Sequence, residues 1–582
     1  MMSPFRFSPR PNRAHEIDWR TWGKEAFAEA DAADRPVLLC LMAVWCQWCH
    51  QMDETTYSDE QLIALINTHF VPIRVDADQY PHVHDRYIAG GWPTNAFLTP
   101  TGEVLWAGTY IDPAQFATVA EGVRSAWAER RVELGAEVER RRKALEAARG
   151  RVSSIGIVRR EAADDVWSAL LESFDARNGG FGTAPKYPTP DAIELLMVKA
   201  GDENGTATTI ATQTLDGMIA GALWDDDAGG FFRYAHGADW TQPQTEKLLT
   251  VNAGLLRAYA TAAHVFGRAD WRTIAERLVS WVDGTLALEQ GLWSASQSSD
   301  PQYYEGGAGG GQAAPAVDTV LYTSANAQWV RALAEAGARL EQRAWVQAAE
   351  RALRQLQDQM MAPNQLFYHY REPNTEPQLP HLLIDVLEVA RACVAVAQAT
   401  GRSELLAQAR AHTAAIEKSF WADEGGFYDR TRTTHDVGVL RYRDRPFDTN
   451  ADTARLLIEL TIALGERSYR ALAERTLALL SPAAGRYSVG GSGFALAVHE
   501  FFEPPIQIFI VGGGQLADSL REAALVVPIA GRRVWPLPAG GRVGTQNFAL
   551  HGSATAYVVG PRGGSIPVTD PTALPEAVAS VS

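Results

Sequence analysis

A short loop that ends in an aromatic side chain recurs along the central part of the sequence. Between these loops, from about residue 158 to 503, apolar residues recur at helical spacing and strand-like alternation is scarce. The loops lie about 50 to 75 residues apart, which is enough for two helices each. They are Asn178-Gly-Gly-Phe181, Ala228-Gly-Gly-Phe231, Gln290-Gly-Leu-Trp293, Asn364-Gln-Leu-Phe367, Glu424-Gly-Gly-Phe427 and Ala484-Gly-Arg-Tyr487. Six loops with a helix on either side predict twelve helices, and six helical hairpins close naturally into a ring, the all-α (α/α)6 toroid.

In such a ring the inner helices surround a funnel, and the aromatic loops stand at its mouth. Aromatic faces combined with carboxylates and amides suit a sugar-like ligand, because rings stack on its apolar faces and fixed polar groups bind its hydroxyls. The predicted substrate-binding residues of the funnel are Tyr187, Tyr234, Trp240, Glu246, Lys247, Asn252, Tyr304, Asp318, Tyr322, His381, Asp385, Asp448 and Asn450. The alternative for each is structural: glycines that end helices, rings that pack, and N-caps at Asp318 and Asp448.

The N-terminal part of the chain carries a pair of cysteines at the end of an apolar run. Val37 to Met42 has the length of a strand, and Cys46-Gln-Trp-Cys49 follows it directly. From Gln51 to Ile66 apolar residues recur at helical spacing, so Cys46 falls at a helix start. Unpaired N–H groups and the helix dipole stabilise a thiolate there, and the thiolate is the nucleophile of disulfide exchange. We predict that Cys46 attacks and that Cys49 resolves.

The residues after the cysteine pair fit the same interpretation. An apolar strand, Phe70 to Val75, is followed by Gly90-Gly-Trp-Pro93 and then by the hairpin from Asn95 to Tyr110. Pro93 stands directly before a strand in a Gly-rich turn, so it is a candidate cis-proline. This order resembles thioredoxin, and it would place Pro93 beside the cysteines as a third catalytic residue. The chain departs from thioredoxin in the dipeptide between the cysteines and in Cys40, which replaces a buried aspartate.

Three other interpretations of the cysteine pair remain open. Cys46-x-x-Cys49-His50 also spells the attachment motif of c-type haem, but the sequence shows no export signal. Zinc would need about four ligands, and His50, His82 and His84 could complete the set. Both cysteines could also be small buried residues without chemistry. We predict no metal and no cofactor.

Length and charge limit the function classes. A chain of 582 residues is too long for one core. A net charge of -16 opposes nucleic-acid binding. We find no apolar run as long as the roughly 18 residues of a membrane span, and four cysteines exclude a disulfide scaffold. We therefore expect a cytoplasmic protein without membrane or nucleic-acid partners. The oligomeric state stays open.

The changes of pattern along the chain predict its domains. We place a thioredoxin-like α/β domain at 1–128, a helical connector at 129–157, the toroid at 158–503 and a small α/β segment at 504–582. In the last part we expect strands at Pro505 to Val511, Leu525 to Ile529 and Ala556 to Val559, with a helix from Gln515 to Ala524. The Gly512 to Gly514 triplet lacks the spacing of a phosphate-binding loop, so we interpret it as a tight turn.

Several longer motifs together resemble one family. They are Trp45-Cys-Gln-Trp-Cys-His50, Gly90-Gly-Trp-Pro93, Gly179-Gly-Phe-Gly-Thr-Ala-Pro-Lys186, Gly229-Gly-Phe-Phe-Arg-Tyr234 and Glu246-Lys-Leu248 with Asn252. On these the chain is similar to the spermatogenesis-associated protein 20-like proteins, in which a thioredoxin-like domain of unknown function 255 precedes a six-hairpin toroid. The toroid is similar in turn to N-acylglucosamine 2-epimerases and six-hairpin glycosidases, which implies a carbohydrate-shaped cavity.

This sequence departs from the family at two places. Gln244 stands where the family usually has a histidine, which removes one candidate acid or base. The stretch after Trp293 is short and ends in the low-complexity run Gly306 to Gly311. Sugar chemistry that depended on that histidine, or on family residues of the stretch after Trp293, would be lost.

Three functions follow from these features. The first is a thiol-disulfide oxidoreductase whose toroid binds a protein disulfide or a small sugar-like substrate. The second is a carbohydrate-active enzyme, an epimerase, isomerase or glycosidase, in which the thioredoxin-like domain is structural or regulatory. The third is an interaction protein without catalysis.

Overall fold

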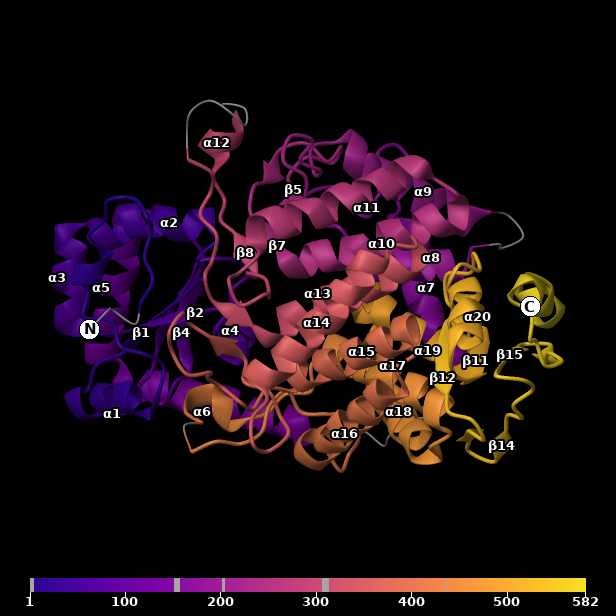
Figure 1. Cartoon of the computed structure of the whole chain (residues 1–582). Helices are drawn as coiled ribbons and strands as arrows, with labels where there is room; N and C mark the ends of the chain where they lie inside the picture. The colour runs from indigo at the N-terminus through magenta and orange to yellow at the C-terminus, as the bar shows by residue number, and fades with distance from the viewer. Residues whose placement is uncertain (1–4, 151–156, 201–204, 306–312, 435) are drawn as a thin grey trace. The chain divides into compact units, whose positions relative to one another are not determined.

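The computed structural model describes residues 5–150, 157–200, 205–305, 313–434 and 436–582 (Figure 1). The predicted low-complexity run at 306–311 lies outside these residues. The chain divides into two compact units. The first, here the N-terminal unit, comprises residues 1–154, 298–300 and 430–444. The second, here the toroid unit, comprises 155–297, 301–429 and 445–582.

A four-stranded sheet in the order β2-β1-β3-β4 forms the centre of the N-terminal unit. Strand β1 (Val37–Met42) is parallel to β2 (Val71–Asp76) and antiparallel to β3 (Thr94–Leu98), which pairs with β4 (Val104–Gly108). Every residue of the first three strands is buried. This explains why β1 is apolar throughout, whereas β2 and β3 bury the polar residues Arg74, Asp76, Thr94 and Asn95. The predicted thioredoxin-like order of strand, cysteine helix, strand, proline and hairpin is confirmed.

Six α-helices accompany this sheet in sequence order. They are α1 (Lys24–Ala33), α2 (Gln47–Glu54), α3 (Glu60–His69), α4 (Pro81–Tyr87), α5 (Pro113–Glu129) and α6 (Arg131–Gly150). The periodic stretch from 51 to 66 is divided between α2 and α3 by a short 3-10 turn at Thr56–Ser58, a break that apolar spacing did not indicate. Helix α6 corresponds to the predicted connector, and its described side chains are mostly exposed.

Twelve helices of the described chain form the ring of the toroid unit. The inner six are α8 (Pro190–Val198), α10 (Leu249–Phe266), α13 (Thr323–Arg339), α15 (Leu383–Thr400), α17 (Phe447–Leu464) and α19 (Ser492–Phe502). Each contacts the next, and α19 returns to α8, so the ring closes. The outer six are α7 (Asp164–Ser173), α9 (Thr206–Ala220), α11 (Ala269–Trp281), α14 (Arg343–Met360), α16 (Ser403–Phe420) and α18 (Arg467–Leu480). Each packs against an inner helix, which confirms the predicted (α/α)6 class.

The aromatic loops all connect an outer helix to the next inner helix, so they gather at one end of the ring. In five of them the aromatic residue closes an antiparallel bridge, as Phe231 does with Trp224. The sixth differs, because Ala484 to Tyr487 lies in a 3-10 helix, Ser481–Gly491. Its prediction as an equivalent loop is wrong. In the other five loops the second residue has a positive φ, whereas Gly485 does not, so the backbone there continues in 3-10 turns.

A small sheet follows the ring in the same compact unit. Its order is β12-β11-β15-β16, with β11 (Gln507–Gly512) parallel to β12 (Arg533–Leu537) and antiparallel to β15 (Ala554–Gly560). The strands predicted near 505 and 556 are confirmed, as is the intervening helix, α20 (Gln515–Leu525). The strand predicted at Leu525 to Ile529 is wrong: Leu525 ends α20, the next residues form a turn, and the strand begins only at Arg533.

No helix in the described part of the chain combines the length and hydropathy needed to cross a membrane.

Candidate functional site

Cys46 occupies the N-cap of α2, where its sulfur accepts a hydrogen bond from the backbone N–H of Cys49 at 3.2 Å. The two side chains are 5% and 2% exposed, so the first cysteine keeps the greater access to solvent. A sulfur that accepts an N–H at a helix start has the geometry in which a helix dipole stabilises negative charge. Burial raises the pKa of Cys49 well above its usual range, and the hydrogen bond to Cys46 adds to the shift. The two thiols therefore differ in solvent access, and Cys49 holds its proton more tightly than an ordinary cysteine.

A buried ion pair lies beside this site. Arg74 of β2 donates to both oxygens of Asp53, at 2.9 and 2.8 Å, and both side chains are at most 2% exposed. Cys40 of β1 is the third thiol, and burial raises its pKa to about 11, against the pull of Arg74. Sequence reasoning missed this pair. A charged residue inside the apolar run Val71 to Val75 was the available signal, because a buried charge requires a partner.

Aromatic rings surround the start of α2. Trp45 packs edge to face against Trp92 at 5.4 Å, and its Nε1 donates to Asp78 at 2.7 Å. The peptide bond from Trp92 to Pro93 is cis. The turn that contains Pro93 therefore meets the residue before Cys46, as the thioredoxin-like order predicts. Trp48, between the cysteines, is 45% exposed and supplies apolar surface beside them.

A segment far away in sequence also belongs to this unit. The backbone N–H of Ser299 donates to the carbonyl of Trp45 at 3.0 Å, and the Ser298 hydroxyl donates to that of Val44 at 3.2 Å. These bonds hold the loop that carries Cys46. Nothing in the local sequence indicates a contact across some 250 residues. The zinc alternative has no support in the geometry: the described residues contain no group of three or more His, Cys, Asp or Glu side chains placed to hold a metal ion.

Several predicted funnel residues bind their own loops in the toroid unit. The Lys247 ammonium is fully buried and donates to Asp225 at 2.6 Å and to the carbonyl of Gly229 at 2.7 Å. Burial lowers the pKa of this lysine to about 8. Trp240, also buried, donates from Nε1 to the carbonyl of Asn178 at 3.1 Å. Both side chains hold glycine loops in shape.

Three asparagines at the same position of α10, α13 and α17 make one repeated contact. Each accepts the backbone N–H of a loop aromatic residue, at 2.6–2.9 Å, and donates to its carbonyl, at 2.8–3.0 Å. The pairs are Asn252 with Phe231, Asn326 with Trp293, and Asn450 with Phe427. Two of these asparagines were predicted funnel residues, and all three fasten loops to helices.

Other predicted residues divide between the loops and the helix starts. Tyr187, half exposed, stacks on Tyr234 at 4.7 Å. Glu246 is 2% exposed and forms an ion pair with Arg233 at 2.9 Å, and burial raises its pKa. Tyr304 packs edge to face on Phe232 at 4.9 Å.

The remaining predictions fall before α13 and α15. Asp318 accepts the N–H of Val320 at 3.1 Å, and Tyr322 is the N-cap of α13, so the predicted cap at Asp318 is wrong. Asp385 accepts from Nδ1 of His369 at 2.9 Å, and burial raises the pKa of this carboxyl. His381 is half-buried just before the N-cap of α15. Sequence reasoning did not include His369, although it follows the fourth aromatic loop by only two residues.

The inner helices enclose a cavity of about 200 Å³ that sequence reasoning largely missed. Here it is termed the axial cavity. Its charged lining consists of Asp191, Arg257, Arg331, Glu388, Arg391 and Asp452. Arg391 donates to Glu388 at 2.9 Å and pairs with Asp452 at 2.8 Å. One carboxylate oxygen of Glu388 has no hydrogen-bond partner among the residues described. Except for Asp191 in the first turn of α8, these charges lie inside their helices, where helical spacing alone does not distinguish the axis of a ring from a solvated face.

Asp448 lies one turn before Asp452 on α17, on the same helix face. It is not the predicted cap, because the N-cap of α17 is Pro446. Although its side chain reaches solvent, the surrounding protein partly desolvates it and raises its pKa to about 6, and the carboxylates of Asp452 and Asp191 add to the shift. Burial likewise raises the pKa values of Asp191 and Glu388. Desolvation and neighbouring carboxylates therefore favour the protonated forms of these three carboxyl groups.

These features define a two-unit protein that combines a thioredoxin-like α/β fold with an (α/α)6 toroid. Residues 8–146 match the family model described as "Protein of unknown function, DUF255". Spermatogenesis-associated protein 20 of Homo sapiens is 30% identical over 310 residues, which cover 49% of this chain and 39% of that protein. Uncharacterized protein B0495.5 of Caenorhabditis elegans is 32% identical over 265 residues, 42% of this chain and 36% of that protein. The predicted resemblance is confirmed, and the matched part covers less than two-fifths of these relatives.

Solved structures with a similar fold include several carbohydrate enzymes. A sugar epimerase from a ruminal bacterium shares 13% identity with a TM-score of 0.46, over 56% of this chain and 85% of that chain. A family 76 glycoside hydrolase from a bovine Bacteroides thetaiotaomicron strain shares 10% identity with a TM-score of 0.44, over 60% and 78%.

Proposed function

We propose that the N-terminal unit catalyses thiol-disulfide exchange, with Cys46 as nucleophile and Cys49 as resolving thiol. The observation that carries the proposal is the N-cap position of Cys46, where its sulfur accepts the Cys49 N–H. The buried Cys49 thiol, with its raised pKa, keeps its proton until the first step has occurred. Four free cysteines in the described chain fit a reducing, cytoplasmic setting.

The reaction balances with a disulfide-bonded protein as the second substrate. The Cys46 thiolate attacks one sulfur of the substrate disulfide, forms a mixed disulfide and releases the other substrate sulfur as a thiolate, which takes a proton from water. Cys49 then loses its proton and attacks the Cys46 sulfur, which releases the second substrate thiolate. The chain ends with a Cys46–Cys49 disulfide, and two electrons have passed to the substrate. The exposed ring of Trp48 gives an unfolded substrate an apolar surface beside the sulfurs.

Thiol trapping across glutathione buffers tests this proposal. We expect one two-electron transition in the wild type, a trapped mixed disulfide with Cys49→Ser, and no transition with Cys46→Ser. The matched control is Cys393→Ser, a buried thiol of α15, which leaves the transition unchanged. A Cys46 that alkylates as slowly as Cys393 in the folded protein contradicts the proposal.

A second candidate function belongs to the axial cavity. We infer acid-base chemistry on a small polar molecule, sugar-like in its hydroxyls, because the pKa values of Asp191, Glu388 and Asp448 are raised around a cavity that Asp452 also lines. A panel of sugars, assayed with Cys46→Ser/Cys49→Ser protein, separates the two functions. Turnover that survives the cysteine changes and is lost with Glu388→Gln supports it. Turnover that Glu388→Gln leaves intact excludes this cavity.

A further inference from the structure

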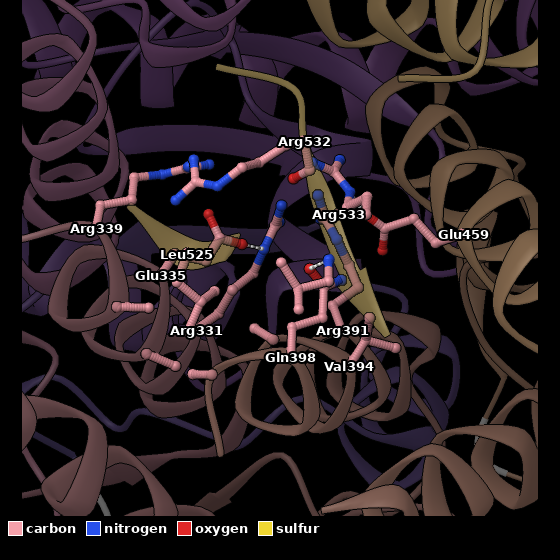
Figure 2. A pocket seen from close by; sticks show the side chains of 15 residues that line it. Arg331, Glu335, Arg339, Arg391, Val394, Gln398, Glu459, Leu525, Arg532 and Arg533 are labelled. Carbon is pink, nitrogen blue, oxygen red and sulfur yellow. Dashed lines mark hydrogen bonds and ion pairs between the residues drawn. The ribbon is translucent and has the colours of Figure 1, made fainter. Parts of the chain in front are cut away.

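A second pocket of the toroid unit contains far more positive than negative charge. Figure 2 shows five arginines and two glutamates around it, drawn from α13, α15, α17 and the start of β12. The arginines are Arg331, Arg339, Arg391, Arg532 and Arg533, and the glutamates are Glu335 and Glu459. Here it is termed the arginine pocket.

The two glutamates are already occupied by other cations. Glu335 accepts from Arg257 at one oxygen and from Arg331 at the other, both at 2.8 Å. Glu459 accepts from Arg533 at 2.9 Å. The carboxylates of the arginine pocket are therefore paired without help from Arg339 and Arg532.

Arg391 and Arg533 have further acidic partners outside the pocket. Arg391 pairs with carboxylates of α15 and α17, and Arg533 donates to Glu500 of α19 at 3.2 Å. Each of these guanidinium groups is thus compensated by negative charge close by. This leaves two of the five arginines to account for.

The hydrogen-bond acceptors of Arg339 and Arg532 are all backbone carbonyls. Arg339 donates to the carbonyl of Ala530 at 3.1 Å, and Arg532 donates to the carbonyls of Ala524 and Ile529 at 2.8 and 3.1 Å. Neither forms an ion pair with a residue that the structure describes. The buried Nε of Arg339 has no hydrogen-bond partner there. In Figure 2 the two guanidinium groups point toward one another.

Two facing guanidinium groups in a buried place are costly, because arginine does not lose its proton in proteins. Arg532 is 4% exposed, and burial lowers its pKa well below the usual range, with Arg339 and Arg533 adding to the shift. Burial also lowers the pKa of Arg339, to about 10. An anion between the two groups would remove both the repulsion and the unmatched donors.

We propose that the arginine pocket binds a small oxoanion, phosphate or sulfate, between Arg339 and Arg532. The volume agrees with this ligand. The cavity measures about 50 Å³, which limits the ligand to a small group. Planar guanidinium forks match the oxygens of such anions. Because Arg532 precedes β12 and Arg339 ends α13, the bound anion would fasten the C-terminal sheet to the ring.

Thermal unfolding of the full chain tests the proposal. The midpoint is measured against increasing sodium phosphate, with sodium sulfate and sodium chloride as separate arms at matched ionic strength. We expect phosphate or sulfate to raise the midpoint with saturation, while chloride does not. In Arg532→Gln and Arg339→Gln the apparent affinity should fall by about tenfold or more, since each loses charged hydrogen bonds to the anion.

The same variants separate ligand binding from a folding defect. Neither variant breaks an ion pair of the described residues, so in chloride buffer both should unfold no lower than the wild type. The matched control, Arg343→Gln, lies nearby on α14 with an exposed side chain paired to Glu522 and should keep the full phosphate response. Equal responses to phosphate, sulfate and chloride would overturn the proposal. So would an undiminished response in both pocket variants.

Discussion

Asp53 and Arg74 show how much depends on a single side chain in the N-terminal unit. Their two hydrogen bonds join α2 to β2 in the interior. Asp53→Asn leaves the guanidinium buried without a charged partner, so we expect a loss of about 3–5 kcal/mol in the free energy of unfolding, measured with denaturant. Glu121→Gln breaks the exposed pair with Arg124 and should cost at most about 1 kcal/mol. Equal losses in the two variants would show that the buried pair is not a stabilising contact.

Asp448 should make stability depend on pH in a defined direction. Its pKa is raised to about 6 in the folded chain, so the folded state holds the proton more tightly than the unfolded state, whose carboxyl titrates near 4. Stability from this group is present at low pH and is lost as the pH rises through about 6. Asp448→Asn should therefore match the wild type near pH 4 and gain on it up to about pH 7.

Chemical denaturation across this pH range measures the effect of Asp448. Asp423→Asn, on the exposed surface after α16, is the control and should show a constant difference from wild type. A constant difference for Asp448→Asn as well would mean that the folded protein does not shift the pKa of this carboxyl.

At the scale of elements, four of the aromatic loops place glycine where the backbone has a positive φ, while Gln365 adopts that conformation in another. Gly180 has φ +76°, and a Cβ there would clash with the buried ring of Trp240. We expect Gly180→Ala to cost at least about 2 kcal/mol. Gly122, exposed inside α5, has open space around it, and Gly122→Ala should stabilise by about 0.5–1 kcal/mol. Thermal melts of both variants give the comparison, and a neutral Gly180→Ala would rule out a packed loop.

The ring and the cysteine helix could be predicted because their signals are local and periodic. Helical spacing and recurrent glycine loops give hairpins, and a cysteine pair after an apolar strand gives a helix start. The strand β12 was missed because Arg532 precedes it and Arg533 is its first residue, and these two charges hid a buried run that ends at Leu537. Both arginines line a pocket whose other residues come from helices that are distant in the sequence. A local sequence pattern carries no information about such contacts.

The two candidate sites differ in how much of them was predictable. Cys46, Cys49 and Pro93 lie within 48 residues of one another, and the structure brings their turns together. The axial cavity instead takes one or two charges from each of several helices. The polar residues nearest the loops, such as Asn252, attracted the prediction, although the structure uses them to hold the loops. The position of a polar residue along its helix, rather than its type, decides whether it holds a loop or lines the axial cavity.

At the scale of the whole molecule, the N-terminal unit is assembled from separate stretches of chain. Arg441 pairs with Glu103 at 2.7 Å, and the Tyr87 hydroxyl, which donates to Gly102, accepts the N–H of Val439 at 3.3 Å. The fragment 1–154 lacks these partners. We expect its turn between β3 and β4 to exchange amide hydrogens faster than in the full chain, and its unfolding midpoint to be lower. Equal protection in the two proteins would show that residues 430–444 add nothing to this unit.

Because the ribosome makes the chain from its N-terminus, the three stretches of the N-terminal unit become available at different times. Residues 1–154 emerge first, but the last stretch of their unit ends at residue 444, so 444 − 154 = 290 more residues must be made. At about 5–20 residues per second, this takes roughly 15–60 s. For the first half of that interval the loop before Cys46 lacks Ser299, and for the second half residues 430–444 are not yet complete. A newly made chain therefore carries Cys46 before the unit around it is complete.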